Sequence, residues 1–161
     1  MNNDSAHKSR WEISEVVFGI PFLIGLVLQW LIPFSVPEGI VRQALIPVGI
    51  VLVIAGVGFI ILARREFAQH RQSMEPGHPI SKIVDTGVFS ISRNPLYLGI
   101  ICTLSGGALA LNILWVLVLL VPSIFLCQYI LIAPEERYLK NKFSEEYVSY
   151  TNSVRRWLGR R

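Results

Sequence analysis

Two short polar motifs flank the longest uncharged stretch of this sequence, and they hold the residues best suited to chemistry. The first is the run RNPLY at Arg93–Tyr97, and the second is Glu135–Glu136. Carboxylates and aromatic faces bind cations, and a guanidinium binds a carboxylate or another anion. Each motif alone also has a plainer interpretation, as an arginine that snorkels at a membrane surface or as acidic residues in the first turn of a helix. The elements that position the motifs decide between these interpretations.

The residues between the two motifs are almost all apolar. No Asp, Glu, Lys or Arg occurs from Asn94 to Pro134, a run of 41 residues. A membrane-crossing helix needs about 20 apolar residues, so this run is long enough to cross a bilayer twice. We predict a helical hairpin that turns near Asn112, with arms over 96–111 and 113–133. Because a hairpin returns the chain to the side on which it entered, the two motifs are expected to be neighbours.

Two more apolar stretches, 16–34 and 43–63, precede the first motif and contain no charged side chain. The chain is 52% hydrophobic and only 16% charged, against about 25% charged in soluble domains, which favours a membrane protein. Residues 64–93 are predicted to be a cytoplasmic loop. The predicted fold is all-α integral membrane, with four transmembrane helices, a C-terminal helical hairpin and a cytoplasmic amphipathic tail helix in 135–161. The whole chain, 1–161, is predicted to be a single domain.

The distribution of basic residues predicts the orientation of these spans. Of the 15 Lys and Arg residues, 14 lie in the N-terminal segment, the loop 64–93 or the tail, and four spans place these three segments on one side. The positive-inside rule makes that side cytoplasmic. Only Arg42 falls on the other side. We therefore predict a multi-pass protein of an inner or plasma membrane, with both termini in the cytoplasm.

The same charge asymmetry accounts for the net charge of +4 without a nucleic-acid partner. Cys102 and Cys127 lie in apolar runs, far from any Cys or His at metal-ligand spacing. The sequence therefore predicts no metal site.

The motifs, taken in order with the hairpin between them, resemble a known family. The first reads GVFSISRNPLYLG from Gly87 to Gly99, and the second reads EERYLKNKFSEEYVSY from Glu135 to Tyr150. This pattern, within about 75–158, is similar to the isoprenylcysteine carboxyl methyltransferase family and its phospholipid methyltransferase relatives. The resemblance implies a membrane-embedded enzyme that takes a methyl group from S-adenosylmethionine and releases S-adenosylhomocysteine.

The resemblance also implies which residues form the site. Arg93 and Glu135 would be catalytic: Glu135 would meet polar groups of the cofactor, and Arg93 would hold its carboxylate or a substrate anion. The residues implied in cofactor binding are Lys82, Ile83, Val84, Phe89, Asn94, Pro95, Leu96, Tyr97, Glu135 and Glu136. The substrate would be a lipid-like or lipidated molecule that enters from the bilayer, so membrane lipid is an expected partner.

Three positions depart from the family pattern. Asn94 replaces a common His, and Ser144 replaces a common Gly. Leu131 stands where isoprenylcysteine enzymes have an Arg suited to a substrate carboxylate. Leu131 therefore bears on the substrate more than on the reaction. A phospholipid or small-thiol methyltransferase, or a non-enzymatic membrane protein on the same scaffold, is an alternative.

Overall fold

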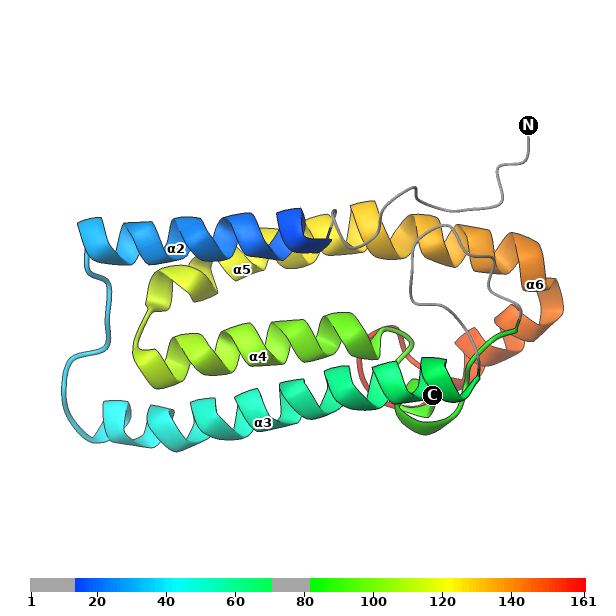
Figure 1. Ribbon diagram of the computed structural model, residues 1–161, viewed down its shortest axis with the longest axis horizontal. Helices are drawn as coiled ribbons and strands as arrows, with labels where there is room; N and C mark the ends of the chain where they lie inside the picture. The colour runs from blue at the N-terminus through cyan, green and yellow to red at the C-terminus, as the bar shows by residue number, and fades with distance from the viewer. Residues whose placement is uncertain (1–13, 71–81) are drawn as a thin grey trace.

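The computed structural model describes residues 14–70 and 82–161, so parts of the predicted N-terminal segment and loop lie outside the described residues (Figure 1). The described chain is helical, apart from the connecting segments and one isolated bridge between Val154 and Arg160. In chain order the helices are the π-helical η1 (Glu15–Gly19), α2 (Ile20–Leu31), α3 (Ile40–Gln69), the 3₁₀ turn η2 (Gly87–Ser90), α4 (Pro95–Leu111), α5 (Leu114–Leu126), the π-helical η3 (Cys127–Ile132) and α6 (Ala133–Ser153).

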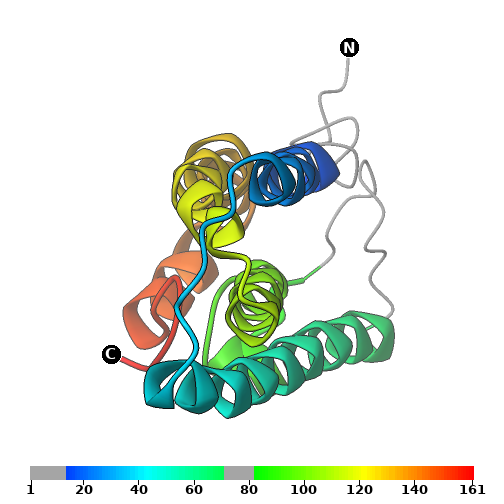
Figure 2. The ribbon, with the colours of Figure 1, turned by 90° about the vertical axis from the view of Figure 1, so that its left-hand side faces the viewer.

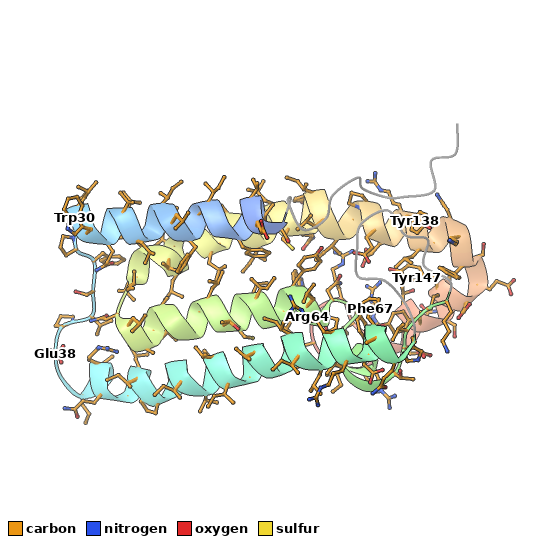
Figure 3. All side chains as sticks on the ribbon, viewed as in Figure 1. Trp30, Glu38, Arg64, Phe67, Tyr138 and Tyr147 are labelled. Carbon is orange, nitrogen blue, oxygen red and sulfur yellow. The ribbon has the colours of Figure 1, made fainter. Side chains whose placement is uncertain are left out.

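Two helices are long and apolar enough to cross a membrane: α3, and the continuous helix Leu114–Ser153 that joins α5, η3 and α6. The helices Glu15–Leu31 and Pro95–Leu111 are apolar but shorter. In the most apolar 18-residue segment of α3, only 11% is buried inside the protein, and Val51 and Ile54 are among the exposed side chains of this helix. Figure 3 shows carbon side chains pointing outward along α2 and α3, with most polar atoms near the ends of the molecule. Such a surface is unfavourable in water and suits contact with lipid.

Helix α3 corresponds to the predicted span 43–63 but is longer, and it continues to Gln69. The prediction that a loop begins at residue 64 was therefore wrong. Arginine and glutamate are good helix formers, so the helix continues through Arg64, Arg65 and Glu66 beyond the apolar run. Glu66 then anchors the segment that follows, since Thr86 Oγ1 donates to Glu66 Oε2 over 2.9 Å.

The helices are arranged as two antiparallel pairs, α2 with α5 and α3 with α4 (Figure 1). The turn between α4 and α5 joins the pairs. In Figure 2, α4 lies between α3, which crosses the view obliquely, and the α2–α5 pair. The polar segments 82–94 and 145–161 lie together at one end, beyond the start of α4 (Figure 1).

Four glycines bring α3 and α4 into close backbone contact. A Cβ atom added at Gly49 would lie 2.5 Å from the carbonyl oxygen of Gly106, and one added at Gly56 would lie 2.6 Å from that of Gly99. Thr103 Oγ1 donates to the Gly99 carbonyl over 2.8 Å and fills the remaining space beside Gly56. Small residues of this kind let membrane helices gain van der Waals contact where lipid supplies no hydrophobic driving force.

The turn between α4 and α5 falls at Asn112, as predicted, with a left-handed φ of 61°. Its side chain binds the connection between α2 and α3: Asn112 Nδ2 donates to the Val36 carbonyl and Val36 N donates to Asn112 Oδ1, both over 2.9 Å. The Arg42 guanidinium donates to the carbonyls of Leu109 (3.0 Å) and Ala110 (2.7 Å). Arg42, the basic residue outside the predicted cytoplasmic segments, thus caps the C-terminus of α4.

The helix α6 bends at Ser144, which has φ 40° and ψ −106°. This is the position at which the family pattern has glycine, and only glycine adopts a positive φ without a steric cost. The bend separates the first half of α6 from the half that carries Tyr147. It turns the second half back toward the start of α4 (Figure 1).

The glycine contact predicts a specific sensitivity to added methyl groups. Gly106→Ala is expected to lower the free energy of unfolding by about 1–3 kcal/mol, because the new Cβ must push α3 away. Gly107→Ala is the matched control, since a Cβ at Gly107 meets nothing within 4 Å. Thermal unfolding in detergent micelles measures both, and an equal loss for the two variants would contradict this packing.

The strained backbone at Ser144 predicts that Ser144→Gly raises the free energy of unfolding by about 1 kcal/mol. Ser149→Gly, at an exposed position in a regular part of the same helix, should instead lower it by about 0.5–1 kcal/mol. The same thermal unfolding assay compares them. Destabilisation by both substitutions would mean that the bend at Ser144 carries no strain.

Candidate functional site

The two polar motifs meet at the end of the molecule where α4 begins. Arg93 Nη1 lies 3.1 Å from Glu136 Oε1, and the two side chains are only 9% and 19% exposed. This contact confirms the prediction that the hairpin makes RNPLY and Glu135–Glu136 neighbours. Proline at the first position of α4 begins the helix directly after Asn94, which leaves Arg93 in the preceding segment, facing α6.

Glu136 has a second cationic partner that the sequence analysis did not identify. Arg156 holds the carboxylate with two hydrogen bonds, from Nε to Oε1 at 3.0 Å and from Nη2 to Oε2 at 2.6 Å. These bonds raise the pKa of Arg156 above its ordinary value. One carboxylate therefore joins the loop before α4 to the end of the chain through two guanidinium groups. The sequence shows Arg156 only as one of several basic residues of the tail.

Tyr147 and Tyr150 of α6 lie beside Arg93, Glu136 and Arg156, and we call these five residues the polar cluster. Arg93 Nη1 donates to the Tyr147 hydroxyl over 3.3 Å, and the Tyr150 hydroxyl donates to the carbonyl of Phe89 over 2.7 Å. Burial, with a smaller contribution from Glu136, raises the pKa of Tyr147 to about 12, and burial also raises the pKa of Tyr150. Both hydroxyls are therefore neutral at physiological pH. From the sequence, these tyrosines are recognisable only as part of the second motif and of the predicted amphipathic tail helix.

The last eight residues, 154–161, double back on themselves, and we call them the C-terminal turn. Arg155 N donates to the Gly159 carbonyl over 2.9 Å, and Gly159 adopts a φ of 100° that suits glycine. The turn is bonded to the loop before α4: Arg93 N donates to the Arg155 carbonyl (3.1 Å), and Gly159 N donates to the Ile91 carbonyl (2.8 Å). The backbone around Arg93 is therefore held by the end of the chain.

Asn94 also contacts the C-terminal turn. Its Nδ2 donates to the carbonyl of Arg156 over 3.2 Å, and its backbone N donates to Ser92 Oγ over 3.1 Å. Ser92 and Asn94 are both buried. The side chain expected to contact a cofactor thus orders the loop in this structure, and its amide nitrogen is committed to the backbone of the tail.

The other predicted site residues differ in how far they are buried and in what they contact. Val84 and Phe89 pack with Ala63 and Val88 against the end of α3, and the ring of Phe89 meets that of Phe67 edge-on at 5.1 Å. Figure 3 labels Phe67 there, at the end of the molecule that also holds Tyr147. Of the remaining predicted residues, Ile83 and Pro95 are buried, Leu96 and Glu135 are partly buried, and Lys82 is exposed.

Tyr97 lies deeper, in an apolar core to which η1, α4, α5 and η3 contribute. It is 7% exposed and belongs to a cluster with Val17, Phe18, Leu131 and others, against which Trp157 of the C-terminal turn also packs. Leu131, which replaces the expected carboxylate-binding Arg, is 1% exposed in that cluster. The structure therefore places an apolar core where the isoprenylcysteine pattern has a cation.

Comparison with known proteins adds one finding. A family model described as Phospholipid methyltransferase matches residues 45–146, which cover most of α3, both arms of the α4–α5 hairpin and the first half of α6. The match includes RNPLY and Glu135–Glu136, but not the C-terminal turn. No curated protein and no solved structure matches the chain.

The shared carboxylate predicts that Glu136→Gln destabilises the cluster. Loss of the charge weakens the hydrogen bonds from two partly buried guanidinium groups, at a cost of about 2–3 kcal/mol. The amides of Arg93 and Gly159, which join the loop to the C-terminal turn, should also exchange hydrogen faster. Hydrogen exchange measured by mass spectrometry on peptides that cover these amides tests this effect.

Glu145→Gln, at an exposed position of the same helix, is the matched control and should leave both stability and exchange unchanged. If Glu136→Gln behaves like this control, Glu136 does not hold the cluster together.

Proposed function

Because the chain belongs to the phospholipid methyltransferase family, within the wider group of membrane methyltransferases that includes the isoprenylcysteine enzymes, we propose that it methylates an amphiphilic acceptor with S-adenosylmethionine. The observation that best supports the proposal is the ion pair between Arg93 and Glu136, which unites the two motifs of the family pattern at one end of the bundle.

We further propose that all four apolar helices span the membrane as a single domain, with both termini on the cytoplasmic side of an inner or plasma membrane. Charge supports this orientation, because Arg93, Glu136 and Arg156 all lie at the end of the bundle that carries most of the basic residues. The amphiphilic acceptor would then approach from the bilayer, and its reacting group would lie at the depth of the polar cluster.

The chemistry of the polar cluster fits the proposed cofactor. S-adenosylmethionine supplies a methyl group on a sulfonium cation, and it also carries an ammonium and a carboxylate. Arg93 Nε is buried and has no hydrogen-bond partner among the described residues, so it can donate to that carboxylate. Glu135, in the first turn of α6, is suited to the ammonium or to ribose hydroxyls. Glu136 is already committed to two arginines, so we assign it a positioning role.

The remaining predicted residues are proposed to form the walls of the cofactor pocket. Asn94, Pro95 and Leu96 would border it at the start of α4, with Tyr97 beneath them. Ile83, Val84 and Phe89 would back the loop side, and Lys82 would lie at its exposed edge. Methyl transfer is a direct displacement at carbon, so the contribution of these residues is alignment and the exclusion of water.

Two acceptor classes fit this family: the carboxylate of an isoprenylcysteine and the amine of a phospholipid. Leu131 favours the amine, because its buried apolar surroundings offer no cation for a substrate carboxylate. A carboxylate needs no general base, whereas a protonated amine must lose a proton before it attacks. Radiolabelled methyl transfer into a lipid extract separates the classes, because a methyl ester is labile to base and a methylated amine is stable.

Cofactor binding is the direct test of the proposed function. Purified protein should bind S-adenosylhomocysteine, and Glu135→Gln should weaken binding by about tenfold or more through loss of a charge-assisted hydrogen bond. Isothermal titration calorimetry measures both affinities. Absence of binding by the unsubstituted protein would refute the methyltransferase proposal and favour a non-enzymatic role.

Two controls separate cofactor contact from folding. Glu145→Gln, exposed on the same helix, should bind with unchanged affinity. Tyr97→Phe keeps the buried ring and removes only the hydroxyl, so the variant should fold and report whether that hydroxyl contributes to binding.

A further inference from the structure

The C-terminal turn carries a basic surface that the proposed reaction does not use. Arg155, Arg160 and Arg161 are exposed, and Leu158 beside them is 57% exposed. Arg155, Trp157, Leu158 and Arg161 line, with Arg156, a shallow depression. Unlike Arg156, which binds Glu136, the three exposed arginines form no ion pair with any carboxylate of the described chain.

The composition of this surface is uniform in charge. No Asp or Glu occurs anywhere from Tyr147 to Arg161. The three exposed arginines therefore lie in a stretch without acidic side chains and create a positive potential, whereas the charge of Arg156 is paired with Glu136. A partner for this surface must be anionic, and it must accept apolar contact from Leu158.

The position of the turn indicates where that partner lies. Trp157 packs against the apolar cluster of Val17, Phe18 and Tyr97, which come from the ends of the first and third apolar helices. The turn is thereby held level with the beginnings of the spans rather than far out in the aqueous phase. Figure 2 shows the C-terminus at the edge of the bundle and not between the helices, so a bilayer around the protein would reach it.

We propose that the C-terminal turn binds the phosphate headgroups of anionic phospholipids in the surrounding leaflet. Guanidinium groups bind phosphate oxygens in a bidentate geometry, and juxtamembrane arginines are attracted to anionic lipid surfaces. Leu158 then enters the acyl boundary between headgroups. This inference rests on the proposed orientation in the membrane, and it does not depend on methyl transfer.

Lipid binding at the turn is coupled to the candidate site through the backbone. The carbonyls of Arg155 and Arg156 accept hydrogen bonds from Arg93 N and Asn94 Nδ2, and Gly159 N donates to the Ile91 carbonyl. A headgroup that immobilises the arginine side chains therefore also orders residues 91–94. Anionic lipid would act as a ligand that stabilises the arrangement of the RNPLY motif.

The test uses the full-length protein in mixed micelles. Dioleoylphosphatidylglycerol is titrated into the micelles, with dioleoylphosphatidylcholine as the neutral comparison, and thermal unfolding and hydrogen exchange at Arg93 and Gly159 are followed. We expect phosphatidylglycerol to raise the Tm and slow exchange at both amides, and added salt to weaken both effects. Equal effects of the two lipids, or the same effect from inorganic phosphate, would overturn the proposal.

Variants assign the effect to the turn. The triple variant Arg155→Gln, Arg160→Gln, Arg161→Gln should require more phosphatidylglycerol for half-maximal effect, by about fivefold for each arginine removed. The control removes the same charge from exposed positions of α6, as Arg137→Gln, Lys140→Gln, Lys142→Gln, and should respond like the unsubstituted protein. If both triple variants lose the response to phosphatidylglycerol equally, the response comes from net charge in general and not from a lipid site at the turn.

The two proposals fail separately. Neither readout needs a cofactor or an acceptor, so a lipid response without S-adenosylhomocysteine binding would refute the proposed function alone. Cofactor binding without a difference between the lipids would refute the lipid site alone.

Discussion

The carboxylate of Glu136 is the interaction on which the candidate site depends. It is shared by Arg93, from the loop before α4, and by Arg156, from the C-terminal turn. Two partly buried guanidinium groups so close together would repel each other without an anion between them. A single side chain on α6 therefore allows three separate segments of the chain to meet in one polar cluster.

That cluster also needs a rigid frame, which the apolar helices supply. The glycine contacts between α3 and α4 fix the position at which α4 begins, and hence the position of Arg93. At the opposite end, Asn112 and Arg42 bind the two connections to each other and to the end of α4. The bend at Ser144 then directs the second half of α6 back over the loop, where Tyr147 reaches Arg93.

Several of these features follow from sequence patterns with a clear physical basis. The uncharged run of 41 residues implies a hairpin because one bilayer crossing needs about half of it, and the turn lies at Asn112, a residue type that tolerates a left-handed backbone. The neighbourhood of Arg93 and Glu136 follows from that hairpin. The end of α3 could not be predicted from the apolar pattern. That pattern ends at Ala63, whereas the good helix formers that come next extend the helix to Gln69.

The sequence by itself determined an all-helical, membrane-type chain and the two motifs that meet, because hydrophobic length and charge are local properties. Only the tertiary structure decided which carboxylate pairs with Arg93 and which distant groups join it. Successive residues of a helix point about 100° apart, so Glu135 and Glu136 differ in direction although they are equivalent as a motif. Arg156 and Tyr147 enter the cluster through a helix bend and a reversed chain end, and their geometry depends on contacts between segments far apart in the sequence.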